Sequence, residues 1–352
     1  MNVRDFTLQF MLQMRSRPGR IAGRLRRRGF RHKVRTPEVG VVRAAAVQLE
    51  WRLCETAEEF VDLVYDTVRA AVAEGAELIA FPEDTASLLV GVMPGLGPML
   101  RSATVDEALR QVGDDVQVAD LFRLLGRATR RIYETTFSTL AHGYGVHIAA
   151  GSAVLPIADQ RVLNIGHLFT PEGRILRQTK CHLMPLEEEW GLAAGEDLEV
   201  FDTALGRIGL PVCMDATFFE TFRILRQLGA EIVVLPMADP EYPYSPWKAL
   251  RGIWPRVQES QVFGVQGALV GEALGMRLTG HAGIYAPLAL TEHGDGRLAV
   301  SDRPEGEALV LADLDVTALR RLREEQPLQL NPALYERYFP RVYSGFWRGG
   351  TH

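Results

Sequence analysis

The chain of 352 residues has a formal net charge of −5, and 47% of its residues are hydrophobic. This length and composition allow one large α/β domain with a substantial core. No uninterrupted apolar run reaches the roughly 18 residues that a membrane-spanning helix requires, so the sequence predicts no such helix.

Residues 1–36 form a basic arm with ten Arg and one Lys against one Asp, which leaves the rest of the chain at −15. The arginines follow a moderately apolar stretch, whereas in a signal peptide the positive residues come first, so the arm does not match a signal peptide. The arm is compatible with binding to an anionic membrane surface, with targeting, or with a disordered or docked segment that neutralises a neighbouring subunit. It lacks interleaved aromatic residues, so we expect no specific nucleic-acid binding. We define residues 1–40 as a basic N-terminal extension.

From residue 41 onwards, strand patterns alternate with helix patterns. The predicted strands are 41–49, 77–81, 147–151, 162–169, 174–179, 207–212, 231–235, 262–270, 282–288 and 308–312. The predicted helices are 57–74, 118–143, 218–229 and 246–260. This alternation, with a hairpin signal at 171–173, predicts sheets packed on each other with helices outside.

Residues 86–116 are predicted to be irregular. The part at 88–97 is apolar and rich in glycine. We interpret it as an interface loop, as a lid over a pocket or as a surface that touches a membrane.

Three predicted strands end at residues that carry chemistry. Glu83 follows the second strand, Lys180 follows the strand at 174–179, and Cys213 follows the strand at 207–212. An acid, a cation and a thiol placed in this way indicate an active site at the carboxyl edge of a sheet.

Cys213 stands where an apolar strand gives way to a helical pattern. Backbone N–H groups at the start of a helix favour a thiolate, which is the nucleophilic form of cysteine. A lone cysteine is more often a small buried hydrophobe, and it is the company of Glu83 and Lys180 that favours the nucleophile. The other two cysteines, Cys54 and Cys181, form no closely spaced pair with it, and the eight histidines form no ligand motif. We therefore expect no disulfide, no metal and a cytoplasmic location, peripheral to a membrane if the arm binds one.

The motifs around these residues resemble the nitrilase superfamily of carbon–nitrogen hydrolases over roughly residues 41–315. They are Phe81-Pro82-Glu83, residues 180–188, Cys213-Met214-Asp215 with Glu220, and the segments 235–236, 256–259 and 280–287. The resemblance implies a four-layer α-β-β-α sandwich, here residues 41–325, and a Glu83-Lys180-Cys213 triad that needs no cofactor. It also implies a second glutamate beside the triad, which we place at Glu188, although Glu187 and Glu189 flank it.

By this resemblance, Cys213 attacks the substrate, Glu83 moves protons, and Lys180 stabilises the developing negative charge with the backbone N–H of Met214. Asp239 and Tyr242 follow the strand after the nucleophile, where the acyl pocket forms, and Trp190 follows the second glutamate. We therefore interpret Met214, Asp239, Tyr242 and Trp190 as substrate-binding residues. His182 is the only histidine near a motif, and we interpret it as a structural hydrogen-bonding residue instead of the base of a Cys-His pair.

The predicted function is hydrolysis of a small linear amide or N-carbamoyl compound through a Cys213 thioester. The alternatives are a nitrilase, an acyltransferase that uses the same acyl-enzyme, and a scaffold protein without turnover. Residues 326–352 form a tail with six aromatic residues in 335–347. Such a tail is expected to cap the body or to cross onto another subunit. The resemblance implies pairing through a helix near the nucleophile, here 218–229, so a homodimer or larger homo-oligomer is expected.

Overall fold

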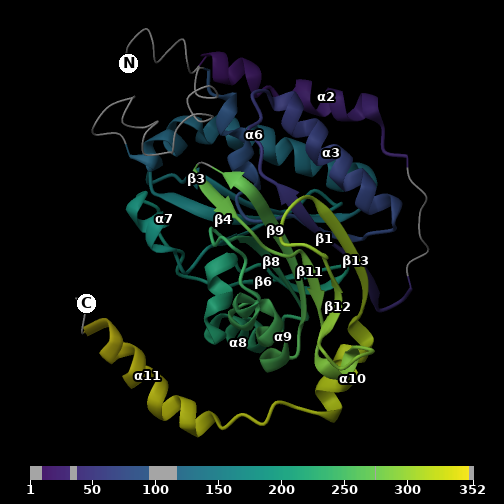
Figure 1. The fold of residues 1–352 in the computed structure, drawn as a ribbon, viewed down its shortest axis with the longest axis vertical. Coiled ribbons are helices and arrows are strands. Elements are labelled where there is room, and N and C mark those ends of the chain that lie inside the picture. The colour runs from purple at the N-terminus through teal and green to yellow at the C-terminus, as the bar shows by residue number, and fades with distance from the viewer. Residues whose placement is uncertain (1–9, 32–37, 95–116, 274, 349–352) are drawn as a thin grey trace.

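A computed structural model describes residues 10–31, 38–94, 117–273 and 275–348. Its two sheets pack face to face and carry helices on both outer surfaces, as Figure 1 shows. The predicted four-layer α-β-β-α sandwich is therefore confirmed.

The first sheet contains β1 to β5 and β13. Their bounds are Val41–Glu50, Leu78–Ala80, His147–Pro156, Val162–Phe169, Ile175–Thr179 and Ala308–Asp315. β1 is at the centre of the molecule, since it pairs in parallel with β2, antiparallel with β13 and, through Gln48–Glu50, in parallel with β9 of the second sheet. This last pairing joins the two sheets at one end.

The second sheet contains β6 to β12. Their bounds are Val200–Thr203, Gly206–Gly209, Ile232–Ala238, Phe263–Ala273, Met276–Leu278, Gly283–Tyr285 and Arg297–Val300. β7, β8 and β9 run parallel, so their carboxyl ends lie at one edge of this sheet.

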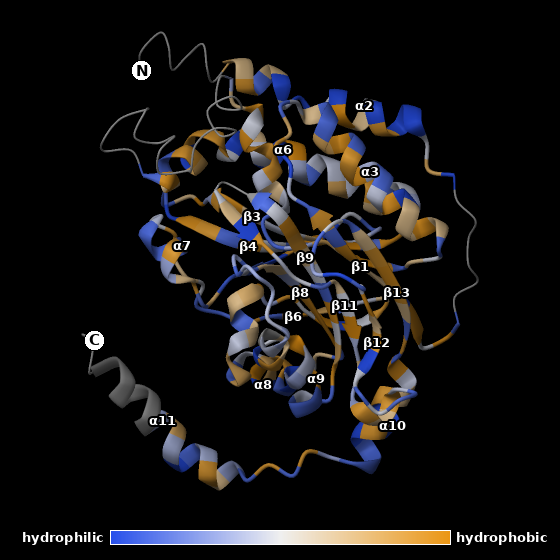
Figure 2. Ribbon diagram, viewed as in Figure 1, coloured by the Kyte–Doolittle hydropathy of each residue, from blue (hydrophilic) through white to orange (hydrophobic). Residues whose placement is uncertain are grey.

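Three hydrophobic cores separate the four layers, and Figure 2 shows the apolar strands between more polar outer helices. Successive residues of each strand serve opposite cores, because side chains alternate across a strand. On β1, Ala44 and Ala46 face the core between the sheets, while Ala45 and Val47 face the outer helices. Both faces of these strands are thus buried, which explains their nearly continuous apolar sequence.

Helices α3 (Ala57–Ala73) and α6 (Val118–Tyr144) cover the first sheet. Helices α8 (Phe219–Gln227) and α9 (Ile253–Ser260) cover the second. The remaining helices are α2 (Pro18–Arg28), α7 (Pro185–Glu189), α10 (Val316–Glu325) and α11 (Pro332–Arg348), with shorter 3₁₀ turns η1 (Thr85–Val92), η2 (Cys213–Thr217), η3 (Pro246–Arg251) and η4 (Leu288–Leu290). Within the described residues, no helix is long and apolar enough to cross a membrane.

Two sequence-based predictions were wrong. The segment at 88–97 is not a lid where it is described, because η1 buries Leu88, Leu89 and Val92 in the core between α6 and the first sheet; residues 95–97 lie outside the described part. The helix predicted at 246–260 is interrupted at Gly252, whose extended backbone separates η3 from α9.

The basic arm folds onto its own chain. Ile21 and Leu25 on α2 are buried against α3 and α6. On the same helix Arg24 and Arg28 pair with Asp62 of α3. The described part of the arm, residues 10–31, thus compensates acidic charge on its own α3, whereas the sequence suggested a neighbouring subunit.

We expect Leu25→Ala to lower the free energy of unfolding by about 2–4 kcal/mol, because it removes a fully buried side chain from the contact between α2 and the body. Denaturant unfolding measures this change. Arg26→Ala, on the exposed side of the same helix, is the matched control and should unfold close to the wild-type midpoint. Equal midpoints for the two variants would contradict a structural role of α2.

The C-terminal tail forms α11, which extends along the outside of the molecule near α8 (Figure 1). Phe339 contacts Phe219 of α8, with ring centroids 6.5 Å apart. Apolar side chains stay largely exposed on both helices, among them Ile224, Leu334 and Tyr338. A second copy of the chain would cover such a surface.

We therefore expect deletion of residues 331–352 to reduce the size of the assembly. Size-exclusion chromatography with light scattering gives the molar mass of both forms. An unchanged molar mass would exclude the tail from assembly.

Candidate active site

Glu83 lies immediately beyond β2, at the carboxyl edge between the two sheets, and is 2% exposed. Its position depends on two glycines that allow neighbouring strands to approach the Phe81–Pro82 backbone. A Cβ on Gly151 of β3 would lie 1.7 Å from the Pro82 carbonyl oxygen, and one on Gly267 of β9 would lie 2.6 Å from the Phe81 carbonyl carbon. The backbone before Glu83 is thus held between β3 and β9.

Lys180 follows β5 and is 1% exposed. Its Nζ donates to Glu83 Oε1 at 2.8 Å and to Glu187 Oε2 at 2.6 Å. Asn164 of β4 joins the same two carboxylates, since its Nδ2 donates to Glu83 Oε1 at 2.9 Å and to Glu187 Oε1 at 3.0 Å. The ammonium is therefore fixed by charge-assisted hydrogen bonds from both sides.

The second glutamate beside Lys180 is Glu187, and the expectation of Glu188 was wrong. Pro185 is the first residue of α7, so Glu187 is the third, where a glutamate turns back to cap the helix. Its Oε2 accepts from the Met184 backbone N–H at 2.8 Å. Glu188, one residue and about 100° further around the helix, is exposed to solvent.

Cys213 begins η2 with a φ of 45°, a left-handed conformation that is uncommon for residues other than glycine and is found at functional sites. Ala238, at the end of β8, links it to Glu83. The Cys213 Sγ lies 3.7 Å from the Ala238 carbonyl oxygen, while the Ala238 N–H donates to Glu83 Oε2 at 3.1 Å. The structure thus brings Glu83, Lys180 and Cys213 together from separate strand ends.

The pKa values of these groups differ from the sequence expectation. Burial and the negative charge of Glu83 raise the pKa of the Cys213 thiol well above its ordinary value, and Lys180 only partly opposes this. Burial beside a carboxylate thus favours the thiol over the thiolate, and the short turn η2 does not offset this effect. Burial also raises the pKa of Glu83, against the effect of Lys180. Burial alone would lower the pKa of Lys180, but Glu83, Cys213 and Glu187 together raise it well above normal.

Asp215 holds the loops of Lys180 and Cys213 at a fixed separation. It is completely buried and accepts hydrogen bonds from the Val212 N–H at 2.9 Å, the Cys181 N–H at 3.2 Å and the His182 N–H at 2.8 Å. His182 Nδ1 also lies 2.8 Å from Asp215 Oδ1, and the His182 ring stacks on Phe218. These contacts agree with a structural role for His182.

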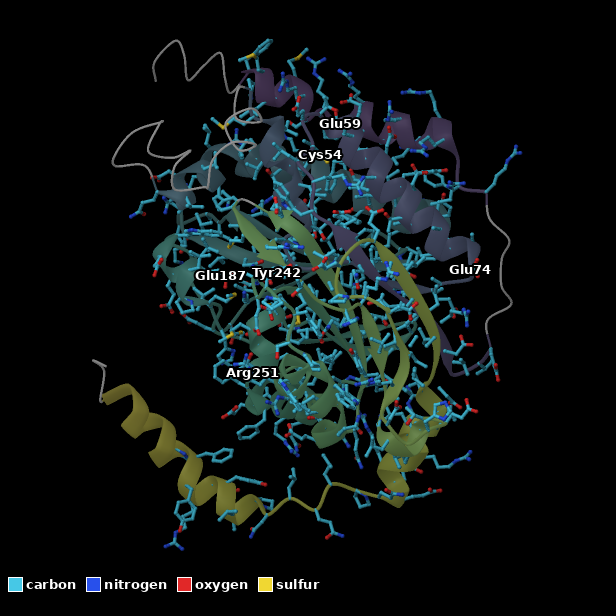
Figure 3. The ribbon with its side chains drawn as sticks, viewed as in Figure 1. Cys54, Glu59, Glu74, Glu187, Tyr242 and Arg251 are labelled. Carbon is cyan, nitrogen blue, oxygen red and sulfur yellow. The ribbon has the colours of Figure 1, made fainter. Side chains whose placement is uncertain are left out.

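A cavity of about 60 Å³ opens beside Glu83, Lys180 and Glu187. Trp190 lines it, as does Ala238, which contacts the Cys213 sulfur. Figure 3 labels Glu187, which belongs to α7. Of the four residues predicted to bind substrate, Trp190 is the one that lines this cavity.

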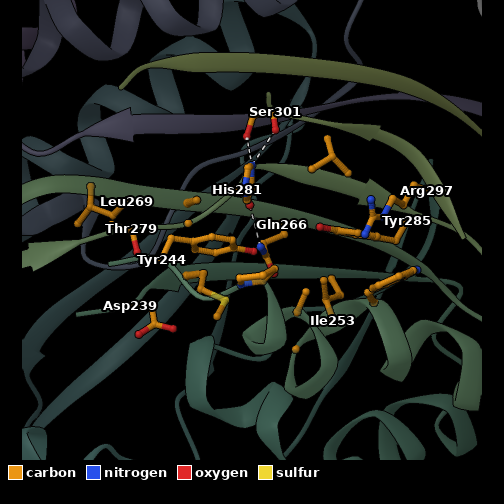
Figure 4. A pocket seen from close by; sticks show the side chains of 18 of the residues that line it. Asp239, Tyr244, Ile253, Gln266, Leu269, Thr279, His281, Tyr285, Arg297 and Ser301 are labelled. Atoms are coloured by element: carbon orange, nitrogen blue, oxygen red, sulfur yellow. Dashed lines mark hydrogen bonds between the residues drawn. The ribbon is translucent and has the colours of Figure 1, made fainter. Parts of the chain in front are cut away.

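A larger cavity of about 430 Å³ lies between β8, β9 and η3–α9 (Figure 4). Asp239 lines it together with Tyr244 and His281, but no triad member does. Leu269 lines both cavities, so they are neighbours. Because a reacting carbon must reach Cys213, we assign the smaller cavity to the reaction.

The structure places the other two predicted residues outside both cavities. Tyr242 is 51% exposed and stacks beneath Arg277, whose guanidinium carbon is 3.6 Å from the ring centroid. Met214 follows the nucleophile, and its sulfur lies 3.6 Å from Thr217 Oγ1.

Sequence reasoning missed two residues of this site. Asn164 is completely buried, and its signal is a lone amide within the apolar strand 162–169. Asp215 was noted only as part of a motif, since nothing in the sequence shows that it reaches the residues after Lys180. Within the described residues, no cluster of three or more His, Cys, Asp or Glu side chains could hold a metal ion.

Comparison with known proteins gives a consistent result. The family model described as "Carbon-nitrogen hydrolase" matches residues 43–324. A probable hydrolase of Bacillus subtilis, YhcX, is 28% identical over 289 residues, which are 80% of this chain and 52% of that protein. The chain thus spans about half of that relative. A deaminated glutathione amidase of Synechocystis is 26% identical over 70% of this chain and 96% of its own length.

Among solved structures, a mutant amidase from Nesterenkonia sp. AN1, with an acetamide group on its active-site cysteine, superposes with a TM-score of 0.61. It is 18% identical, and the match covers 87% of this chain and all of that one. At this identity the likeness concerns the fold.

We expect Asp215→Asn to lower the free energy of unfolding by about 2 kcal/mol or more and to reduce kcat, because an amide nitrogen would face backbone N–H donors. Denaturant unfolding and steady-state kinetics measure the two effects. Asp202→Asn, at an exposed carboxylate, is the control. Wild-type values for both properties in Asp215→Asn would show that the two loops are held by other contacts.

Proposed function

The chain belongs to the carbon–nitrogen hydrolase family and is a hydrolase of C–N bonds other than peptide bonds. On this premise, we propose that it cleaves a small linear amide or N-carbamoyl compound through a thioester on Cys213. The observation that carries the proposal is the hydrogen bond from the Lys180 ammonium to Glu83. It lies at the same sheet edge as Cys213, whose sulfur contacts the end of β8. The amidases among its relatives support an amide as substrate.

In the first half-reaction the Cys213 thiol gives its proton to Glu83 while its sulfur bonds to the substrate carbonyl carbon. The carbonyl oxygen becomes negatively charged, and the Lys180 ammonium and the Met214 N–H stabilise this charge. Glu83 then returns the proton to the substrate nitrogen, the C–N bond breaks, and the amine leaves. The acyl group stays on sulfur as a thioester.

In the second half-reaction water attacks the thioester and gives a proton to Glu83. Collapse of this tetrahedral species releases the acid and breaks the C–S bond, and Cys213 regains its proton from Glu83. Glu187 holds Lys180 and takes no proton in this scheme. The raised pKa values of Glu83 and Cys213 suit this exchange, because they keep the proton within the pair.

We expect Cys213→Ala to reduce amide turnover by about three orders of magnitude or more, because it removes the group that bonds to the substrate. Intact mass spectrometry after incubation with amides, N-carbamoyl amino acids and nitriles should show a substrate-dependent adduct in the wild type and none in Cys213→Ala. Cys181→Ala, which removes another thiol close to Lys180, is the matched control and should still form the adduct.

The same experiment separates the alternatives. Acid and ammonia formed from a nitrile, without amide turnover, would identify a nitrilase. Transfer of the acyl group to an added amine in preference to water would identify an acyltransferase. Absence of both adduct and turnover across the panel would contradict the proposal and favour a scaffold protein.

A further inference from the structure

Asp84 is an ionisable residue of the reaction cavity that the proposed mechanism does not use. It follows Glu83 directly and lines the same cavity as Glu83, Lys180 and Glu187. Its Oδ1 is buried and has no hydrogen-bond partner among the described residues. A buried carboxyl oxygen in this situation is costly unless another molecule supplies a donor.

The backbone turn at Asp84 does not require the carboxyl group. Asp84 has a φ of 55°, a conformation that asparagine tolerates as well as aspartate does. Its N–H donates to Ser152 Oγ at 3.0 Å, and its carbonyl oxygen accepts from the Ser87 N–H at 2.8 Å. The turn is therefore complete without the side chain.

The charges around the cavity are not balanced. Lys180 is the cation in this group, and both of its described hydrogen bonds go to Glu83 and Glu187. Asp84 adds a third carboxyl group, and burial followed by the charges of Glu83 and Glu187 raises its pKa well above normal, which favours its neutral form as long as no further cation is bound. Much of the remaining wall is apolar, with Phe122, Trp190 and Leu278 among its residues. A cationic group on the substrate would supply the missing hydrogen-bond donor and, by its positive charge, would favour the carboxylate form of Asp84.

We propose that Asp84 binds a protonated amine of the substrate, so that the enzyme prefers short amino-amides to neutral or carboxylate-bearing amides of the same length. The cavity of about 60 Å³ holds only a few non-hydrogen atoms, which limits the substrate part beside Glu83 to a short chain. Asp84 and Glu83 are consecutive residues, so the amine binds close to the scissile carbonyl group. This inference rests on the proposed function.

The test compares kcat/KM for amides that differ only in one terminal group. Glycinamide, β-alaninamide and 4-aminobutanamide are each paired with the amide in which a methyl group replaces the ammonium: propanamide, butanamide and pentanamide. Succinamate and glutaramate supply the carboxylate. For at least one chain length, wild type should prefer the cationic member, and Asp84→Asn should lower the cationic-to-neutral ratio about tenfold to a hundredfold, the effect of losing a charged hydrogen bond.

Glu189→Gln is the matched control, since it removes an exposed carboxylate at the end of α7, outside the cavity, and should leave the ratio at the wild-type value. Binding is measured separately by calorimetry with Cys213→Ala and with Cys213→Ala combined with Asp84→Asn. The cationic amide should bind the first more tightly than the second.

A wild-type preference for neutral or carboxylate-bearing amides would overturn the inference, as would an unchanged ratio in Asp84→Asn. Either result leaves the proposed function intact, provided that wild type still forms the Cys213 adduct. Loss of the adduct with every amide would instead refute the proposed function.

Discussion

The burial of one ammonium between two carboxylates is the constraint on which this site depends. Lys180, Glu83 and Glu187 are at most 8% exposed, and removing such charges from water costs several kcal/mol per ion. The arrangement is tolerable only because the three groups, together with Asn164, satisfy one another at hydrogen-bond distance. A buried ion cluster of this kind contributes little net stability, which agrees with the proposed roles of Lys180 as a fixed cation and Glu83 as a base.

The four-layer sandwich provides the rigidity that this cluster needs. Parallel strands bring Glu83 and Cys213 to the edge where the two sheets meet, and β1 joins the sheets by pairing with both β2 and β9. Asp215 then sets the distance between the loops of Lys180 and Cys213, since it accepts backbone N–H groups from both. Because the donors are preorganised, little reorganisation is needed when charge develops on the substrate.

Two described segments outside the sandwich, α2 and α11, contact it. The basic arm neutralises acidic residues of α3, and α11 places aromatic side chains near α8. Arg24 and Arg28 are already paired with the chain's own acids, so they contribute less positive charge to any anionic surface than the sequence suggests.

The sequence alone predicted alternating strands and helices, and its resemblance to the nitrilase superfamily implied the four layers and the triad. Nearly continuous apolar runs indicate strands buried on both faces. A residue that follows such a strand is expected at the edge of the sheet, and this places Glu83, Lys180 and Cys213 without coordinates. The sequence did not decide which of Glu187, Glu188 and Glu189 turns inward, because that choice depends on where α7 begins. Moving the start of the helix by one residue rotates every side chain by about 100° around its axis. It also did not show that Asn164 reaches both carboxylates, that Asp215 joins two loops, or that burial beside Glu83 raises the pKa of the Cys213 thiol. Each of these depends on which groups from distant segments are desolvated together, and only the packed tertiary structure decides that.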